Sequence, residues 1–343
     1  MGDFSKLLSL LLHYILDKYT LELSMNPKMT LSDAADFLGI SARQLFKRLI
    51  ENDLPYARSS GVVCFGYPTA RQLFRLALKP KAIAFQIVKG GTGKTSLAYA
   101  VAVRANLYGL KVLCIDLDQQ GNLTNSFGVD AETLPVMVDI LAENYSFEES
   151  IKRIYSGMDL LASRIENALL DDVIKLKRLD LKQVYRQPLE KLKQNYDLIV
   201  IDCPPNLGQS VAAVTLAVDQ VIAPVVADGY AISGLQATQN AIRELEQNYN
   251  TQIPLLVTIN KYDSRLVLPK QTQSILSKIS SHVHASTAFS NAIMCGQSLF
   301  DTARTNQAKR DIDHLTREIL GIQKIIATMP EFELNTNMEE LFV

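Results

Sequence analysis

The sequence predicts an α/β protein with a mostly parallel, doubly wound sheet and a small, mainly helical N-terminal domain. After Pro80, short runs rich in β-branched residues alternate with segments of helical length, which is typical of crossover units in a sheet buried on both faces. Before Pro80, capping signals and a glycine turn indicate short helices. The 343 residues also exceed the size at which one core usually stops growing. We therefore expect two domains that meet near Pro80.

The larger domain is expected to contain six strands separated by helices. The apolar runs that predict these strands lie at residues 83–88, 112–115, 158–161, 198–201, 221–226 and 255–259. The run at 158–161 is the weakest of them.

The net charge of −1 conceals an asymmetry along the chain. Residues 1–80 hold ten of the 35 basic and seven of the 36 acidic residues, a net charge of +3, so the rest of the chain carries −4. This balance excludes a globally basic DNA-coating protein and leaves room for a local basic patch. The four cysteines are scattered without a C-x-x-C pair, which favours reduced thiols in a cytoplasmic protein.

A leucine-rich segment near the N-terminus, residues 7–16, has the spacing of an amphipathic helix. It is far shorter than the roughly 20 apolar residues that a membrane-spanning helix needs. The helix is expected either to pack on its own domain or to form a dimer contact.

The strongest motif is K-G-G-T-G-K-T-S at residues 89–96, directly after a strand and before a helical run. Glycines let backbone N–H groups surround phosphate oxygens, and the helix N-terminus adds its dipole. Lys94 can reach the β- and γ-phosphates, and the Thr95 hydroxyl can ligate Mg²⁺. Val88 stands where the ordinary pattern has its first glycine. The expected nucleotide-binding residues of the loop are Gly90, Gly91, Thr92, Gly93, Lys94, Thr95 and Ser96.

This variant loop resembles the deviant Walker A motif of the ParA/MinD family, in particular its partition branch. Residues 112–124 (VLCIDLDQQGNLT) are similar to the family's D-x-D-P-Q-G-N segment, with Gln119 in place of proline. Residues 196–208 (YDLIVIDCPPNLG) resemble its Walker B segment. The resemblance covers roughly residues 81–325 and implies a P-loop NTPase fold that uses ATP and Mg²⁺.

Three aspartates follow strands in these segments. Asp202 ends an apolar strand, which suits a carboxylate that holds Mg²⁺ directly or through water. Asp116 and Asp118 are two residues apart at a strand end and therefore point to the same side. The resemblance implies that Asp118 orients the attacking water and that Asp116 supports the metal shell. It also implies that Lys89 reaches the partner's phosphates across an ATP-sandwiched homodimer.

Residues 260–263 spell N-K-Y-D, which bears on whether the protein binds an adenine or a guanine nucleotide. Many phosphate-loop GTPases read guanine with an N-K-x-D element, so a GTPase of the signal-recognition class is an alternative. The deviant loop favours ATP, and Asn260 is then a candidate contact to adenine.

The N-terminal domain, residues 29–80, carries capping boxes at 30–33 and 41–44 around Gly39. Two short helices with a glycine turn predict a helix-turn-helix, and residues 58–65 a wing. This arrangement resembles the winged helix-turn-helix ahead of the ATPase in larger plasmid partition proteins. A small helical cap with solvated basic side chains is the alternative. The candidate DNA-binding residues are Arg43, Gln44, Lys47, Arg48 and Arg58.

The resemblance implies a DNA partition ATPase that dimerises around ATP and Mg²⁺ and binds DNA. Hydrolysis would be slow until a centromere-binding, ParB-like partner stimulates it, and the N-terminal domain would read an operator of its own operon. A nucleotide-switched DNA-binding repressor with negligible turnover is the alternative. We expect a cytoplasmic, nucleoid-associated protein without membrane attachment. The expected divisions are an N-terminal helix at 1–28, the reader at 29–80, the ATPase at 81–328 and an acidic tail at 329–343.

Overall fold

The computed structural model describes residues 27–59, 61–143, 145–227, 231–263, 265, 279, 281–294, 297–301 and 306–322. The leucine-rich segment and the acidic tail lie outside the described residues. No helix in the described ranges is long and apolar enough to cross a membrane.

In the part of the chain that the structure describes, eight strands form one sheet in the order β11-β10-β9-β4-β8-β5-β7-β6. All pairs are parallel except β6 with β7. Each of the six predicted runs contributes a strand, and the two edge strands, β6 and β11, lie outside those runs. The strands are β4 (Lys81–Phe85), β5 (Val112–Asp116), β6 (Ile151–Tyr155), β7 (Met158–Leu161), β8 (Leu198–Asp202), β9 (Gln220–Val226), β10 (Leu255–Tyr262) and β11 (Ser281–His284).

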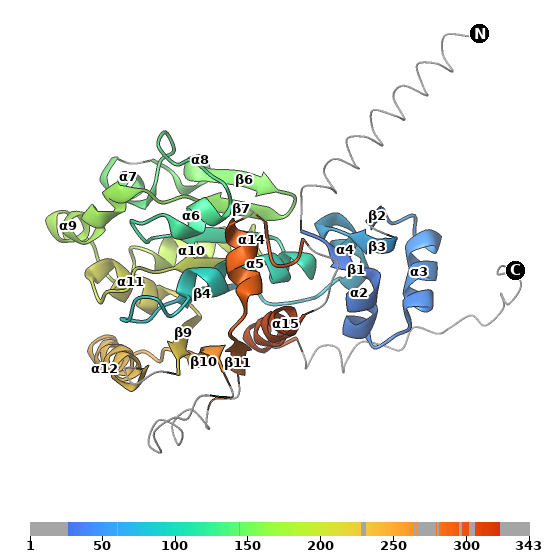
Figure 1. The fold of residues 1–343 in the computed structure, drawn as a ribbon. Coiled ribbons are helices and arrows are strands. Elements are labelled where there is room, and N and C mark those ends of the chain that lie inside the picture. The colour runs from blue at the N-terminus through green and yellow to red at the C-terminus, as the bar shows by residue number, and fades with distance from the viewer. Residues whose placement is uncertain are drawn as a thin grey trace, which may run out of the picture.

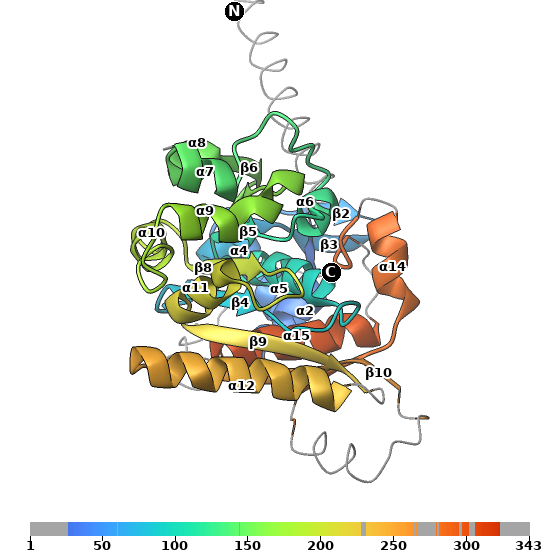
Figure 2. The same ribbon diagram turned by 90° about the vertical axis from the view of Figure 1, so that its left-hand side faces the viewer.

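Helices cover both faces of this sheet, as expected for a doubly wound fold (Figures 1 and 2). They are α5 (Lys94–Leu107), α6 (Asn122–Ser126), α7 (Met137–Glu143), α8 (Phe147–Ser150), η1 (Ile165–Leu169), α9 (Leu170–Leu176), α10 (Arg186–Leu192), α11 (Gln209–Ala217), α12 (Ala231–Tyr249), α14 (Thr287–Met294) and α15 (Gln307–Leu320).

Alternate side chains of each strand enter two different cores, because successive side chains of a strand point to opposite faces. In β4, Ile83 and Phe85 pack in the cluster that contains α5 and α15. Their neighbours Ala82 and Ala84 pack in the cluster that contains α11. The strands are therefore apolar on both faces, which explains why they read as continuous apolar runs in the sequence.

Between residues 27 and 74, the described elements form a separate three-stranded antiparallel sheet, in the order β1-β3-β2, with three helices. Thr30 caps α2 by accepting from the backbone N–H of Asp33, and Ser41 and Gln44 form a complete capping box on α3. Gly39 ends α2 in the left-handed conformation, at φ 65°. The elements are β1 (Met29–Thr30), α2 (Leu31–Leu38), α3 (Ala42–Glu51), β2 (Ala57–Ser59), β3 (Val62–Phe65) and α4 (Tyr67–Phe74).

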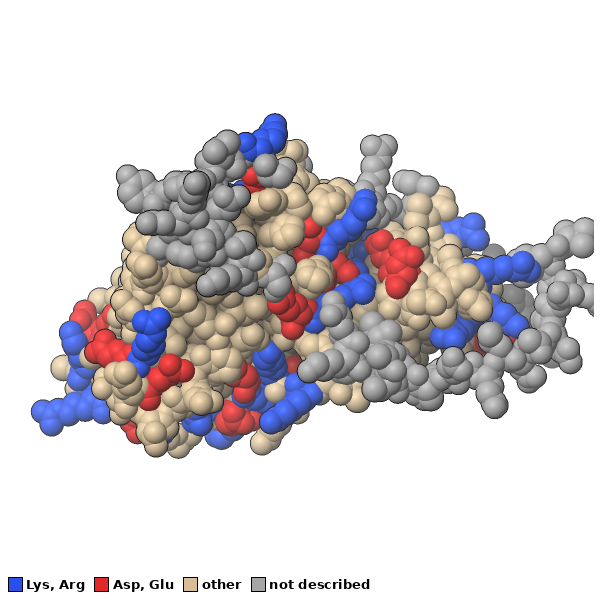
Figure 3. Space-filling model, turned by 90° about the horizontal axis from the view of Figure 1, so that it is seen from below, with Lys and Arg blue, Asp and Glu red and all other residues tan. Residues whose placement is uncertain are grey.

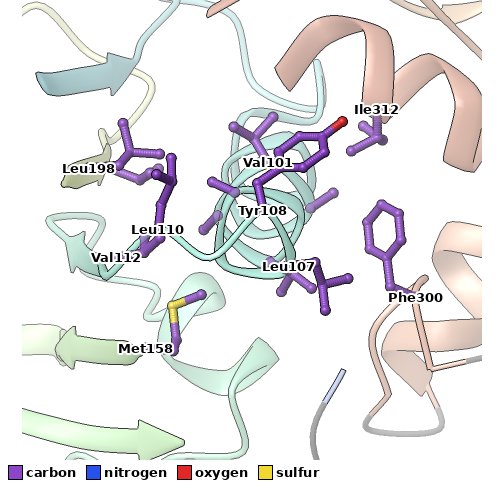
Figure 4. Packing of buried hydrophobic residues seen from close by; sticks show 14 of the residues in the cluster. Val101, Leu107, Tyr108, Leu110, Val112, Met158, Leu198, Phe300 and Ile312 are labelled. Carbon is purple, nitrogen blue, oxygen red and sulfur yellow. The ribbon is translucent and has the colours of Figure 1, made fainter. Parts of the chain in front are cut away.

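These N-terminal elements pack against the carboxyl end of α5 and beside α15 (Figure 1). The ring of Phe37 lies 4.5 Å from that of Tyr108, and Arg71 donates to the carbonyl oxygen of Gly109 at 2.9 Å. Gly109 has φ +81°, and a Cβ there would lie 2.6 Å from the Cα of Arg71. The contact therefore requires glycine. Figure 4 shows the continuous core behind it, with Tyr108 next to Ile312 of α15.

Candidate functional site

A cavity of about 970 Å³ opens where the carboxyl ends of the parallel strands meet. This edge is the usual ligand site of an open α/β sheet. Its wall contains the start of α5, the loops after β5 and β8, and the end of β10 and β11. The lining residues are Gly90, Gly91, Gly93, Lys94, Thr95, Ser96, Leu97, Asp118, Gln119, Gln120, Asn122, Asn125, Ser126, Pro204, Pro205, Asn206, Asn260, Lys261, His284, Ser286 and Phe289.

The phosphate loop forms the floor of the cavity, at the N-terminus of α5. Gly93 precedes the helix in the left-handed conformation, at φ +89°. A Cβ on Gly93 would lie 2.2 Å from Nδ2 of Asn260, so both the backbone angle and the neighbour require glycine. The loop and the helix N-terminus together provide the N–H groups that bind phosphate.

Two residues at the end of β10 brace this loop. Nδ2 of Asn260 donates to the carbonyl oxygen of Thr92 at 2.7 Å, and its Oδ1 accepts from the backbone N–H of Lys261. Nζ of Lys261 donates to the carbonyl oxygen of Gly91 at 3.0 Å. Asn260 thus lies in the cavity wall, and its side chain is engaged with the loop. The bracing role of Lys261 was not predicted, although it belongs to the N-K-x-D element.

The start of α5 and the end of β8 create a polar pair suited to a divalent cation. The Thr95 hydroxyl donates to Oδ2 of Asp202 at 2.6 Å. Oδ1 of Asp202 is buried and has no hydrogen-bond partner among the described residues. Burial and the nearby Asp116 carboxylate raise the pKa of Asp202 well above its usual value. An unpaired carboxylate oxygen beside a hydroxyl is a donor set that fits Mg²⁺ and its bound water.

Lys94 is nearly buried, at 7% exposed. Burial lowers the pKa of its ammonium group, and Asp202 and Asp118 oppose that effect. A buried cation next to unfilled space favours an anion of high charge, since pairing offsets the cost of burying the charge. The residues that line the cavity therefore fit a nucleoside triphosphate with its bound Mg²⁺.

Asp116 and Asp118 differ in what surrounds them. Asp116 is fully buried and accepts from the backbone N–H and the hydroxyl of Thr124, at 2.9 and 2.8 Å, and from the backbone N–H of Asp118. Burial raises the pKa of Asp116 to about 6. Asp118 lines the cavity and accepts from the backbone N–H of Gln120 at 3.1 Å. Asp116 thus holds the loop that presents Asp118 to the cavity.

Lys89 lies at the entrance of the loop and does not line the cavity. Its Cβ lies beside Gly234 of α12, where an added Cβ would approach to 3.2 Å.

The cavity wall also contains residues that the sequence did not predict as ligands: His284, Ser286 and Phe289. His284 ends β11, which pairs with β10, and Ser286 and Phe289 follow in the next loop and in α14. The order of the strands is therefore the signal that could have found them. Asp263, the guanine-reading position of an N-K-x-D element, accepts from the guanidinium of Arg265 at 2.8 and 2.9 Å. This pairing lowers the pKa of Asp263 to about 2.

The predicted DNA-contacting residues lie away from this cavity. Arg43 and Lys47 are exposed on α3, Gln44 and Arg48 are half-buried there, and Arg58 is exposed on β2. Figure 3 shows Lys and Arg side chains predominating at the end of the molecule that the N-terminal elements form, whereas the two signs are mixed elsewhere on that face.

Comparison with known proteins gives consistent matches over the larger domain. A family model described as an AAA domain (AAA_31) matches residues 80–255. Sporulation initiation inhibitor protein Soj of Bacillus subtilis is 34% identical over 180 residues, which cover 50% of this chain and 69% of Soj. Chromosome-partitioning ATPase Soj of Thermus thermophilus is 30% identical over 202 residues, which cover 59% of this chain and 77% of that protein.

The fold is also found in solved structures. Cobyrinic acid a,c-diamide synthase of Mycobacterium smegmatis, with bound ATP analog and magnesium, superposes with a TM-score of 0.61 at 24% identity. The match covers 74% of this chain and all of that one. With its deviant phosphate loop, its sheet order and these relatives, the chain belongs to the ParA/MinD family of P-loop ATPases.

Proposed function

We propose that this protein is a Mg²⁺-dependent ATPase that acts in DNA partition. The observation that carries the proposal is the Thr95–Asp202 pair, with its unpartnered carboxylate oxygen, beside the buried Lys94. The name of the Thermus relative, a chromosome-partitioning ATPase, supports the reaction and the process. The ATP analog and magnesium in the synthase structure support the ligand.

The cavity residues divide the work of phosphoryl transfer, which depends mainly on positioning and on charge neutralisation. The loop amides and Lys94 would hold the phosphates, and Thr95 and Asp202 would hold the metal. Bound Mg²⁺ would neutralise part of the negative charge of the phosphates. Asp118 is held at the cavity by Asp116 and would orient the attacking water. Asp116, whose oxygens already accept three hydrogen bonds, would support the metal shell only through this loop.

The protein would act as a homodimer in which Lys89 reaches the phosphates of the second copy. The position of Lys89 outside its own cavity supports this arrangement. A second lysine at the transferring phosphates would play the part of an arginine finger.

The N-terminal elements would form a winged helix-turn-helix that binds DNA. Support comes from the order of α2, the turn at Gly39 and α3, followed by the β2–β3 hairpin. α3 presents Arg43 and Lys47 to solvent, as a recognition helix must. The dimer would associate with the nucleoid in the ATP state, read an operator through α3, and be released when a ParB-like partner stimulates hydrolysis.

The test is DNA binding by the full chain in the presence of ATP, ADP or GTP, with Lys94→Ala as the control. Retention on DNA that requires ATP and is lost in Lys94→Ala is the expected result. Equal retention with all three nucleotides would overturn the proposal. ATP-dependent retention without any phosphate release would instead favour a nucleotide-switched repressor.

A further inference from the structure

We propose that His284 reads the 6-amino group of adenine and so makes the cavity selective for 6-aminopurine nucleotides. The inference rests on the proposed function, since it assigns a specificity-determining residue of the same nucleotide site. It identifies a hydrogen-bond acceptor that the sequence motifs did not point to.

His284 lies in the cavity wall on β11, outside the phosphate loop and α5. It is the last residue of β11 and pairs with Tyr262 of β10. Together with Ser286 and Phe289 it lines the same cavity as the phosphate loop. Phe289 is half-buried in this wall, and an aromatic side chain there can contact a planar base. This part of the wall therefore combines an aromatic side chain with the polar groups of His284 and Ser286.

The orientation of the His284 ring is determined by a buried carboxylate on α15. Oδ2 of Asp311 accepts from the backbone N–H of His284 at 2.8 Å and lies 2.9 Å from Nδ1 of the ring. Oδ1 of Asp311 accepts from the side-chain amide of Gln307 at 2.8 Å. Asp311 is 7% exposed, so it has little access to solvent. The edge-to-face contact with Tyr262, at 5.3 Å between centroids, restrains the ring further.

This environment assigns the tautomer of His284. A carboxylate can only accept, so Nδ1 carries the hydrogen that faces Asp311. In a neutral imidazole, Nε2 then presents a lone pair. The side chain is 33% exposed, which leaves the ring accessible beyond its contact with Asp311. Nε2 can thus accept a hydrogen bond from an exocyclic amine. A carbonyl oxygen at the same position is also an acceptor, so it would repel Nε2.

Other polar groups of the cavity wall are engaged: Oγ of Ser286 accepts from the backbone N–H of Ala288 at 3.2 Å. Asn260 and Lys261 brace the phosphate loop, and the Asp263 carboxylate pairs with Arg265. The aspartate at the guanine-reading position of a GTPase is thus paired with Arg265. His284 carries an acceptor on a ring that a buried carboxylate orients, which places it to distinguish a 6-amino from a 6-oxo purine.

The experiment compares the affinities of the full-length protein for ATP and inosine triphosphate, both with Mg²⁺, at mildly alkaline pH. The two bases differ at the 6-position and in the proton on N1. We expect the wild type to prefer ATP by about tenfold, the value of one hydrogen bond together with an avoided acceptor clash. His284→Ala should reduce this ratio to about one, and His284→Gln, whose amide oxygen accepts, should restore part of it.

His314→Ala is the matched control, because His314 is an exposed histidine on α15 and does not line the cavity. It should keep the wild-type ratio. A wild type without preference, or a His284→Ala protein that keeps the preference while both affinities fall equally, would overturn the assignment. Loss of all triphosphate binding in the wild type would instead contradict the nucleotide site itself, which separates the two failures.

Discussion

Thr95 and Asp202, which are 107 residues apart, meet in a hydrogen bond of 2.6 Å at the carboxyl edge of the sheet. Thr95 lies in the first turn of α5 and Asp202 is the last residue of β8. The pair therefore joins the phosphate loop to the neighbouring strand and leaves one carboxylate oxygen without a partner among the described residues.

Thr95→Ala should weaken ATP binding in the presence of Mg²⁺ by about tenfold, because one oxygen that holds the metal is lost. ATP binding in EDTA should change little, since the loop amides remain. Titration calorimetry under both conditions measures the two affinities. Thr95→Ser keeps the hydroxyl and should behave like the wild type. An equal loss of ATP affinity with Mg²⁺ and in EDTA would show that Thr95 does not act through the metal.

Asp202→Asn should stabilise the nucleotide-free protein at neutral pH. Burial and Asp116 raise the pKa of Asp202 in the folded state, so the charged carboxylate destabilises the fold as the pH rises through that value. Removing the charge should raise Tm by roughly 2–4 °C at neutral pH, for a gain on the order of 1 kcal/mol. The difference should narrow as the pH falls and the wild-type group takes up a proton.

Differential scanning fluorimetry without Mg²⁺, over a range of pH, checks this prediction. A variant that melts below the wild type at neutral pH would contradict it. Adding ATP and Mg²⁺ should reverse the order, because the wild type then gains the ligand's binding energy.

Asn260→Ala should weaken the binding of ATP and inosine triphosphate to the same extent, by about tenfold, because the carbonyl of Thr92 loses its donor and the loop loses a brace. The ratio of the two affinities should not change. Competition against a fluorescent nucleotide measures both affinities. A selective loss of ATP binding would instead make Asn260 a direct contact to adenine.

Phe37→Ala should loosen the N-terminal elements from the rest of the chain. Phe37 is 1% exposed and packs on Phe74 and Tyr108, so truncation should cost about 3–5 kcal/mol of unfolding free energy. Urea denaturation measures the loss, and limited proteolysis should cut sooner near Pro80. Phe46→Ala, at a half-buried ring that contacts Tyr56 within the N-terminal elements, is the control and should cost much less.

Arg43→Ala with Lys47→Ala should weaken DNA binding and lower its dependence on salt, because each phosphate contact adds about one released counterion. Binding measured at several salt concentrations gives the slope. Lys175→Ala, an exposed lysine on α9, should leave the slope unchanged. Unaltered affinity and slope in the double variant would remove α3 from the DNA-binding surface.

The sheet could be predicted from the sequence because its strands are buried on both faces and are rich in β-branched residues. The edge strand β6 could not, because Lys152 and Arg153 are exposed there and interrupt the apolar run. The loop residues from Gly90 to Ser96 could be located because phosphate binding requires glycines next to a helix N-terminus. These signals are local, so a single sequence contains them.

Contacts between distant residues could not be predicted in the same way. Nothing in the sequence near His284 points to Asp311, 27 residues further on, because the pairing depends on how α15 packs against β11. Gly109 reads as the end of a helix, and only its approach to Arg71 explains why glycine is required. The sequence also led us to expect that Asn260 faces the base, whereas its amide is engaged with Thr92.

The release of phosphate from ATP, measured with Mg²⁺ and DNA for the wild type, Lys94→Ala and Asp118→Ala, tests the central claim most directly. The account predicts slow turnover by the wild type and background release by both variants, with Asp118→Ala still binding ATP. Background release by the wild type, or an unchanged rate in Asp118→Ala, would contradict it.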